Sequence, residues 1–266
     1  MNLRHVLGLV GLGAGALCSL AGCSRTSPGA ADASDAGVEM AGEATCQPSV
    51  ADDQAPLMKP MNDSWTVLRV GGDMKAQVTR DGRGFRFDRM LIDTPLPVGY
   101  PDPTPPGAIE LKKYPSVRRA EASGESSPDL GMNFAFFPLF NHIKRRDIAM
   151  TSPVEMDYRP VREDSTQWTM SFLYREASLG PTGPDRNVTV VDVPPMTVVA
   201  IGMRGRYSVE RAKAQLPALE KWLAENPQWE RAGDFRALYY NGPDRRTADQ
   251  WAEVQIPIRP AGAPRE

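Results

Sequence analysis

The chain has 266 residues, of which 41% are hydrophobic and 24% are charged, and its formal net charge is −2. A net charge this close to zero argues against a nucleic-acid-binding protein, which needs a basic face. Three cysteines are too few for a disulfide framework, and no C-x-x-C or H-x-x-x-H spacing suggests a zinc site. The length fits one large domain or two small ones.

The N-terminal residues 1–22 have the layout of a secretory signal peptide. Arg4 and His5 form a short basic region, and an uncharged stretch of apolar and small residues follows up to Cys23. This ending resembles the bacterial lipobox, whose cysteine is lipidated and becomes the new N-terminus. We therefore expect a lipoprotein anchored through Cys23; a plain signal peptide and a membrane anchor are the alternatives. Ser24 in the next position favours the outer membrane, facing the periplasm, by analogy with enterobacterial sorting.

Residues 23–60 are expected to form a flexible tether. They are rich in Ala, Ser, Gly, Asp and Pro, and such a segment buries too little apolar surface to offset its ordering entropy. The tether carries a net charge of −4, whereas the chain from residue 61 onward carries +1. Once the signal peptide is removed, His142 is the only histidine, and Cys46 is interpreted as an incidental exposed thiol.

Residues 61–106 are predicted to form a small β extension and a proline-rich linker. Residues 65–70 have the pattern of a strand, and residues 75–79 and 85–87 are candidates for two more. Six prolines between residues 95 and 106 exclude a helix or a central strand. The segment either adds strands to the edge of a sheet or covers a cleft as a lid.

Residues 107–260 repeat one order of elements: strand, Pro, strand, helix and further strands. In the first unit we expect strands at 109–114 and 117–122, a helix at 132–145, and strands up to 158 and at 168–174. In the second unit we expect strands at 188–193 and 196–203, a helix at 208–226, and a last strand at 252–258. Two β-β-α-β-β units predict an α+β domain of antiparallel strands with pseudo-twofold symmetry and two helices outside. Residues 261–266 are expected to be a disordered tail.

The two expected helices differ in their apolar faces. In the second helix Ser208 is a candidate N-cap, Pro217 should introduce a kink, and Pro227 follows its end. Its apolar stripe consists of Ala212, Leu216, Leu219 and Leu223. The first helix is more aromatic, and its common face consists of Phe136, Leu139, Phe140 and Ile143. Phe134 and Phe137 lie away from that face.

The chain from about residue 107 to residue 258 resembles the SOUL haem-binding protein family. The run I-A-M-T-S-P-V at residues 148–154 is its strongest single feature. The other matching features are Leu111-Lys112-Lys113-Tyr114-Pro115 with Arg118 and Arg119, Phe136-x-x-Leu139-Phe140-x-x-Ile143, Tyr240-Asn241-x-Pro243, Arg245-Arg246 and Glu253-Val254.

The resemblance implies a distorted antiparallel β-barrel with two flanking helices, built from two similar halves. It also implies non-covalent binding of haem or another tetrapyrrole in a hydrophobic cleft beside the first helix. Axial ligation by histidine is not general in the family. The candidate ligand-binding residues are Phe136, Leu139, Phe140, His142, Ile143, Lys144, Arg145 and Arg146.

Each group of candidates also has a structural interpretation. His142 stands where the family usually has an aromatic residue, so it is either an axial iron ligand or a surface histidine near a helix C-terminus. The basic residues 144–146 either hold propionates or stabilise that helix end. The apolar residues of the helix either line the cleft or belong to the core.

We therefore expect a lipid-anchored protein of the cell envelope that binds haem or a related tetrapyrrole reversibly. No C-x-x-C-H, G-x-S-x-G or Walker motif is present, so covalent haem attachment is excluded and catalysis has no sequence support. The alternatives are a small-molecule-binding or hydrolytic enzyme of the effector-binding barrel type and a ligand-free envelope scaffold. A buried glutamate in a central cleft would favour the enzyme, and Glu155 and Glu253 are its candidates.

Overall fold

The computed structural model describes residues 65–125, 127–162 and 165–263, all within one compact unit, Met58–Glu266. The expected signal peptide, Cys23 and the tether lie outside the described residues, as does the second half of the expected tail. In the described part of the chain, no helix combines the length and the apolar character needed to cross a bilayer.

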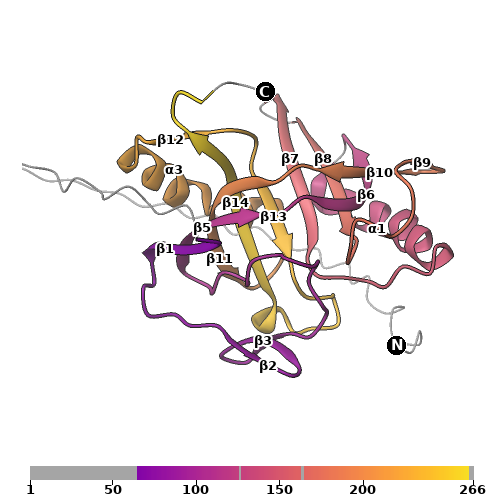
Figure 1. Cartoon of the computed structure of the whole chain (residues 1–266), viewed down its shortest axis with the longest axis horizontal. Coiled ribbons are helices and arrows are strands. Elements are labelled where there is room, and N and C mark those ends of the chain that lie inside the picture. Colours follow the sequence, from indigo (N-terminus) through magenta and orange to yellow (C-terminus); the bar gives the residue numbers. More distant parts are fainter. Residues whose placement is uncertain (1–64, 126, 163–164, 264–266) are drawn as a thin grey trace, which may run out of the picture. The chain divides into compact units, whose positions relative to one another are not determined.

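Eleven strands of the described chain pair in antiparallel fashion to form one large sheet (Figure 1). They are β1 (Val67–Gly72), β5 (Ala108–Tyr114), β6 (Val117–Gly124), β7 (Val154–Arg162), β8 (Ser165–Leu173), β9 (Gly183–Asp185), β10 (Val188–Val193), β11 (Met196–Arg204), β12 (Trp229–Arg231), β13 (Arg236–Tyr239) and β14 (Trp251–Pro260). A second, small sheet consists of β2 (Thr79–Asp81), β3 (Gly84–Phe87) and β4 (Met90–Ile92). The helices are α1 (Pro128–Arg145), α2 (Val209–Lys213) and α3 (Leu216–Glu225). The expected α+β class is confirmed.

The large sheet is open. Its strand order is β1-β5-β11-β14-β13-β7-β8-β6-β10-β9, with β12 paired to β14. Among the described strands no pairing joins β1 to β9, so the closed barrel that the family resemblance implied is not observed. The eight strands from β5 to β10 are arranged symmetrically in this order. Exchanging β5 with β10, β6 with β11, β7 with β13 and β8 with β14, and then reading the list backwards, gives the same order again.

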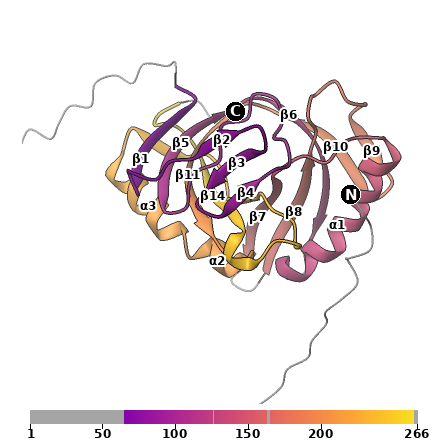
Figure 2. The same ribbon diagram turned by 90° about the horizontal axis from the view of Figure 1, so that it is seen from below.

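Side chains alternate between the two faces of this sheet, and each face is covered differently. On β7, Met156 and Tyr158 lie in the core that α1 and α3 cover, and we call this side the helix face. Glu155 lies on the opposite side, among buried charged groups. We call that side the extension face, because residues 73–107 pack against it. Figure 2 shows β2, β3 and β4 in front of β11 and β14, between α1 and α3.

Helix α1 is amphipathic and begins at Pro128. Pro128 occupies its first turn, where a missing N–H costs no hydrogen bond. Leu139 and Ile143 are buried against the sheet, and burial of such a side chain contributes about 1.5–3 kcal/mol. Gly131 packs so closely on Trp168 that an added Cβ would lie 2.1 Å from the indole ring. A glycine at this position therefore lets the first turns of α1 approach β8.

The expected second helix is two helices. Ser208 caps α2 by accepting a hydrogen bond from the Arg211 N–H, as predicted. The helix breaks at residues 214–215, and Pro217 lies in the first turn of α3. The proline therefore begins a new helix here, whereas a kink in a continuous one was expected. The apolar stripe does face the sheet, since Ala212 and Leu219 are fully buried.

The N-terminal extension is an integral layer of this unit. Strand β1 pairs with β5 at the edge of the sheet. This confirms the predicted alternative in which the segment adds strands to a sheet edge. Residues 75–78 form no strand, contrary to expectation, and the second strand is only β2. The proline-rich residues 95–106 form no regular element apart from a bridge of Pro106 with Gly202, and many of them are buried on the extension face. They are a covering segment, which replaces the expected linker.

Candidate functional site

Helix α1 carries the predicted ligand-binding residues except Arg146, which directly follows it, and their side chains point in different directions. Successive residues of an α-helix are about 100° apart around its axis. Leu139 and Ile143 point into the core of the helix face and are 0% and 4% exposed. They pack against the sheet, and no ligand on the surface of the protein can reach them without displacing α1.

Phe136 and Phe140 lie on the flank of α1 between its buried and exposed sides. Both are half-buried, and their rings stack with centroids 5.8 Å apart. Phe136 also meets Phe172 of β8 edge-on at 5.3 Å. Stacked and edge-on aromatic pairs contribute about 0.5–1.5 kcal/mol beyond their buried area. We call Phe136 and Phe140 the aromatic flank; its rings are held in place and still partly open to solvent.

His142 lies on the other side of α1. It is two residues from Phe140, which places the two side chains about 200° apart around the helix axis. Its ring is 1% exposed, with Nδ1 2.9 Å from Asp185 Oδ2 and Nε2 2.7 Å from the Tyr174 hydroxyl. Because the Asp185 carboxylate only accepts, a neutral ring donates from Nδ1 and accepts at Nε2. Both ring nitrogens are thus occupied by the protein itself, and the structure does not bring His142 together with the aromatic flank.

Burial lowers the pKa of His142 below its ordinary value, and the hydrogen bond to Asp185 opposes this effect only in part. The pKa of Asp185 is lowered, first by the hydrogen bond from Arg146. Folding therefore favours a neutral imidazole beside an ionised carboxylate. The cluster fastens β9 to the C-terminal end of α1.

The three predicted basic residues also separate. Arg145 and Arg146 both contact Asp185, at 3.5 Å and 3.1 Å. Lys144 is exposed, and it follows Phe140 by one helical turn. Of the three, Lys144 is therefore the residue placed beside the aromatic flank.

Two exposed phenylalanines on α1 were not among the predicted site residues. Phe134 is 76% exposed and Phe137 is 59% exposed. Phe137 meets the ring of Phe136 edge-on at 6.0 Å, so it borders the aromatic flank. The sequence already signalled them, because helical spacing places both outside the apolar stripe.

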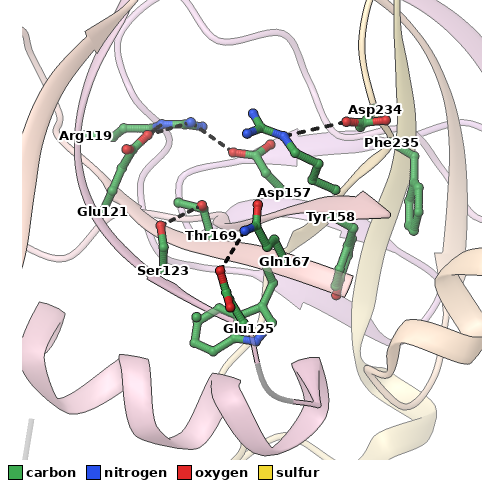
Figure 3. A pocket seen from close by; sticks show the side chains of 13 residues that line it. Arg119, Glu121, Ser123, Glu125, Asp157, Tyr158, Gln167, Thr169, Asp234 and Phe235 are labelled. Atoms are coloured by element: carbon green, nitrogen blue, oxygen red, sulfur yellow. Dashed lines mark hydrogen bonds and ion pairs between the residues drawn. The ribbon is translucent and has the colours of Figure 1, made fainter. Parts of the chain in front are cut away.

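A cavity of about 590 Å³ lies elsewhere, where β6, β7 and β8 meet residues 234–235 (Figure 3). Its lining contains four carboxylates and two guanidinium groups beside three aromatic side chains. Arg119 pairs with Glu121 at 2.7 Å and with Asp157 at 2.9 Å. Ser123 and Thr169 share a hydrogen bond of 2.8 Å. No residue of α1 lines this cavity, and such a polar lining does not suit a flat apolar macrocycle.

A second cavity, of about 550 Å³, lies between β1 and the proline-rich segment. Arg69 donates to Glu110 Oε1 at 3.0 Å and 2.9 Å on its wall. The residues of α1 do not contribute to this cavity either.

Glu253, one of the two candidate glutamates, is fully buried on the extension face. It accepts hydrogen bonds from the Lys112 ammonium at 2.7 Å, from the Thr104 N–H at 2.6 Å and from the Tyr240 hydroxyl at 2.6 Å. Burial would raise the pKa of Glu253, but Lys112 and these hydrogen bonds outweigh it and hold the pKa below its usual value.

Glu155, the other candidate glutamate, is also fully buried. It contacts Arg119 at 2.8 Å and Arg236 at 3.3 Å, and it accepts from the Tyr100 hydroxyl at 3.2 Å. Burial would raise its pKa too, and the two guanidinium groups hold it below the usual value. Both glutamates are therefore ionised, neutralised by cations of this chain and covered by residues 100–104. This arrangement does not present a free carboxylate to a substrate.

Within the residues that the structure describes, no group of three His, Cys, Asp or Glu side chains is arranged to hold a metal ion. The residues present fit the periphery of a tetrapyrrole, through the aromatic flank and Lys144. His142 offers no free ring nitrogen as an axial ligand for its iron, because both nitrogens are hydrogen-bonded within the protein.

The fold has similarities among solved structures. A DNA complex of EcmrR has a TM-score of 0.48 at 14% identity, covering 57% of this chain and 57% of the EcmrR chain. An uncharacterized conserved protein from Listeria innocua has a TM-score of 0.47 at 14% identity, and the match covers 59% of this chain and 94% of that protein. A hydrolase from Listeria innocua has a TM-score of 0.45 at 14% identity, and the match covers 59% of this chain and 93% of the hydrolase. Comparison with curated proteins gives no match.

The SOUL heme-binding protein family matches residues 103–257, which is more than half of the chain and includes α1, the aromatic flank and the two candidate glutamates, Glu155 and Glu253. The chain belongs to the SOUL heme-binding protein family.

Proposed function

We propose that the protein binds haem or a related tetrapyrrole non-covalently and reversibly on the aromatic flank of α1. The carrying observation is the pair Phe136 and Phe140, stacked and half-buried within the region that matches the family. A planar macrocycle stacks on such rings and removes their remaining apolar surface from water.

The charge next to the flank suits the carboxylates of a porphyrin. Lys144 follows Phe140 by four residues, or about 6 Å along the helix axis, so its ammonium reaches the rim of a macrocycle stacked on Phe140. An ammonium–carboxylate hydrogen bond is about twice as strong as a neutral one. Haem would supply a redox-active iron, while the protein would hold the ring and its carboxylates. His142 takes no part in this proposal, because it lies on the other side of α1 and its ring nitrogens are engaged.

We further propose that the two halves of the sheet are related by a pseudo-twofold axis. The exchangeable strand order supports this proposal. The helices of the halves nevertheless differ, since α3 has no basic residue in its last turn and its one aromatic side chain, Trp222, is buried. One tetrapyrrole per chain, bound at α1, follows from that difference.

The envelope location is also a proposal. It rests on the lipobox-like end of the N-terminal segment at Cys23 and on the composition of residues 23–60. In this proposal an acyl chain on Cys23 holds the protein at the outer membrane, facing the periplasm. Mass spectrometry of the protein from native membranes would show diacyl or triacyl Cys23 as the first residue.

Titration with hemin, followed through the Soret band, tests the binding site. We expect saturable binding that is about tenfold weaker in Phe140→Ser, since a lost aromatic contact of about 1.4 kcal/mol corresponds to that factor. Phe87→Ser, at a half-buried phenylalanine of β3, is the matched control. Lys144→Gln should weaken binding of hemin but leave its dimethyl ester unaffected. Equal affinities of Phe140→Ser and the wild type would exclude the aromatic flank.

A further inference from the structure

The outward side of α1 combines apolar and basic side chains, of which the proposed ligand site uses only Lys144. Phe134, Phe137, Asn141, Lys144 and Arg145 are all exposed. At about 100° per residue they fall within an arc of roughly 100° around the helix axis, so they share one face. We call these five residues the outer face of α1.

The outer face changes character along the helix. Its N-terminal half carries the two phenylalanines, which are the two large aromatic side chains exposed among the described residues. Its C-terminal half carries Lys144 and Arg145, with Arg146 directly after them. Asp129, the acidic residue of the first turn, accepts a hydrogen bond from the Val209 N–H at 3.0 Å, so its carboxylate is turned toward α2. No acidic side chain of the helix therefore lies between the phenylalanines and the basic end.

We propose that the outer face of α1 docks on an anionic lipid bilayer. Helices that bind at a membrane surface bury Phe, Trp and Leu at the boundary between headgroups and acyl chains, and their Lys and Arg side chains are attracted to anionic lipids. The rings of Phe134 and Phe137 enter the boundary between headgroups and acyl chains. Lys144 and Arg145 meet the lipid phosphates, and each basic residue near such a surface contributes about tenfold or less in affinity.

The length of the chain before residue 65 is consistent with a lipid bilayer as the partner of the outer face. Between the proposed acyl site at Cys23 and the first described residue, Trp65, lie 41 residues. A flexible chain of that length has a root-mean-square span of roughly 35 Å, which keeps the domain at high effective concentration near its own bilayer. A weak second contact then suffices to orient the domain. The inference rests on the proposed anchor for this orientation, and it adds a direct contact between the folded domain and lipid.

The orientation has a consequence for the proposed ligand. The aromatic flank lies beside the outer face, since the rings of Phe136 and Phe137 are in contact. Docking therefore brings the tetrapyrrole site to the membrane surface, where apolar macrocycles concentrate.

Vesicle sedimentation tests the proposal with a chain of residues 24–266, which keeps every described contact and lacks the segment proposed to be the signal peptide. The vesicles are phosphatidylcholine with or without 30% phosphatidylglycerol. We expect binding only with phosphatidylglycerol, weaker at high salt, and at least tenfold weaker in the double variant Phe134→Ser/Phe137→Ser. Val98→Ser is the matched control, because Val98 is 57% exposed on the covering segment.

Two results would overturn the docking proposal: no phosphatidylglycerol-dependent binding by the wild type, or equal binding by the double variant. A concentration-dependent dimer without vesicles that the double variant abolishes would also overturn it, because a second copy would then cover the outer face. Hemin titration of the double variant separates the two proposals. If the double variant binds hemin normally but no longer binds vesicles, the result supports docking. If the wild type itself does not bind hemin, only the proposed ligand is contradicted.

Discussion

At the scale of single residues, the cluster of His142, Asp185 and Tyr174 makes the fold sensitive to pH. Burial gives His142 a lowered pKa in the folded chain, so the unfolded chain binds more protons once the pH falls below about 6.5. Stability therefore rises with pH through this window and is lost as the pH falls through the folded pKa.

We expect the midpoint temperature of thermal unfolding to decrease when the pH is lowered from 7 to 6. The decrease should be smaller in His142→Gln. The comparison uses the chain of residues 24–266, in which His142 is the only histidine. Gln keeps a donor and an acceptor at this position and does not titrate. Parallel slopes for the two proteins would show that other groups carry the pH dependence.

A second prediction concerns the buried pair Lys112 and Glu253, whose side chains are 0% exposed and 2.7 Å apart. Lys112→Met leaves a buried carboxylate without its cation, which costs about 3–5 kcal/mol of unfolding free energy. Lys221→Met, in the exposed pair with Glu225, should cost less than about 1 kcal/mol.

Urea denaturation of both variants measures these costs. The double variant Lys112→Met/Glu253→Gln should recover part of the loss, because the uncompensated charge is gone. Equal losses for the single and double variants would mean that packing, rather than charge, makes Lys112 important.

At the scale of elements, the extension supplies hydrogen-bond partners to buried groups of the sheet. Thr104 donates to Glu253 at 2.6 Å, and the Trp251 indole donates to the Thr104 carbonyl at 2.7 Å. Lys112 donates to the Asp102 carbonyl at 2.7 Å. Removing this segment leaves buried polar groups without partners, and each such group costs about 1–3 kcal/mol.

A chain that starts at residue 107 should therefore show no cooperative thermal unfolding, although it contains nearly all of the family match. A chain that starts at residue 61 should unfold cooperatively and serves as the control. Near-ultraviolet circular dichroism distinguishes the two outcomes, and a native-like spectrum of the shorter chain would contradict the role assigned to the extension.

The same elements show what the sequence could and could not predict. The strand β10 was predicted to the residue, because five of the six side chains of Val188–Val193 are β-branched. The strands β9 and β12 were missed, since three residues are too few to show periodicity. The prolines of residues 95–106 correctly excluded helices and central strands, but they gave no indication that the segment packs on the sheet. Thr104, for example, donates a hydrogen bond to Glu253, which is 149 residues away in the sequence. Such a long-range contact leaves no local signal.

The candidate site was predicted only in part, because its long-range contacts also leave no local signal in the sequence. Helical spacing correctly placed Leu139 and Ile143 on one apolar face, but it does not say which side of that face meets the sheet. The same spacing separates His142 from Phe140 by about 200°. The partners of His142, Tyr174 and Asp185, are 32 and 43 residues away, so their hydrogen bonds could only be seen in the folded structure.

At the scale of the whole molecule, the two faces of the sheet have different roles. The extension face is closed by residues of the chain itself, and its buried charges are paired. The helix face carries α1, whose flank and outer face remain partly free of protein contacts. We therefore place the proposed ligand and the proposed membrane contact on the same helix.

The most direct test of this account is saturable binding of hemin to the chain of residues 24–266. We predict one equivalent per chain, a shift of the Soret band, an unchanged Soret maximum in His142→Ala and about tenfold weaker binding in Phe140→Ser. A Soret band that stays that of free hemin at micromolar protein would contradict the proposal that this protein holds a tetrapyrrole on α1.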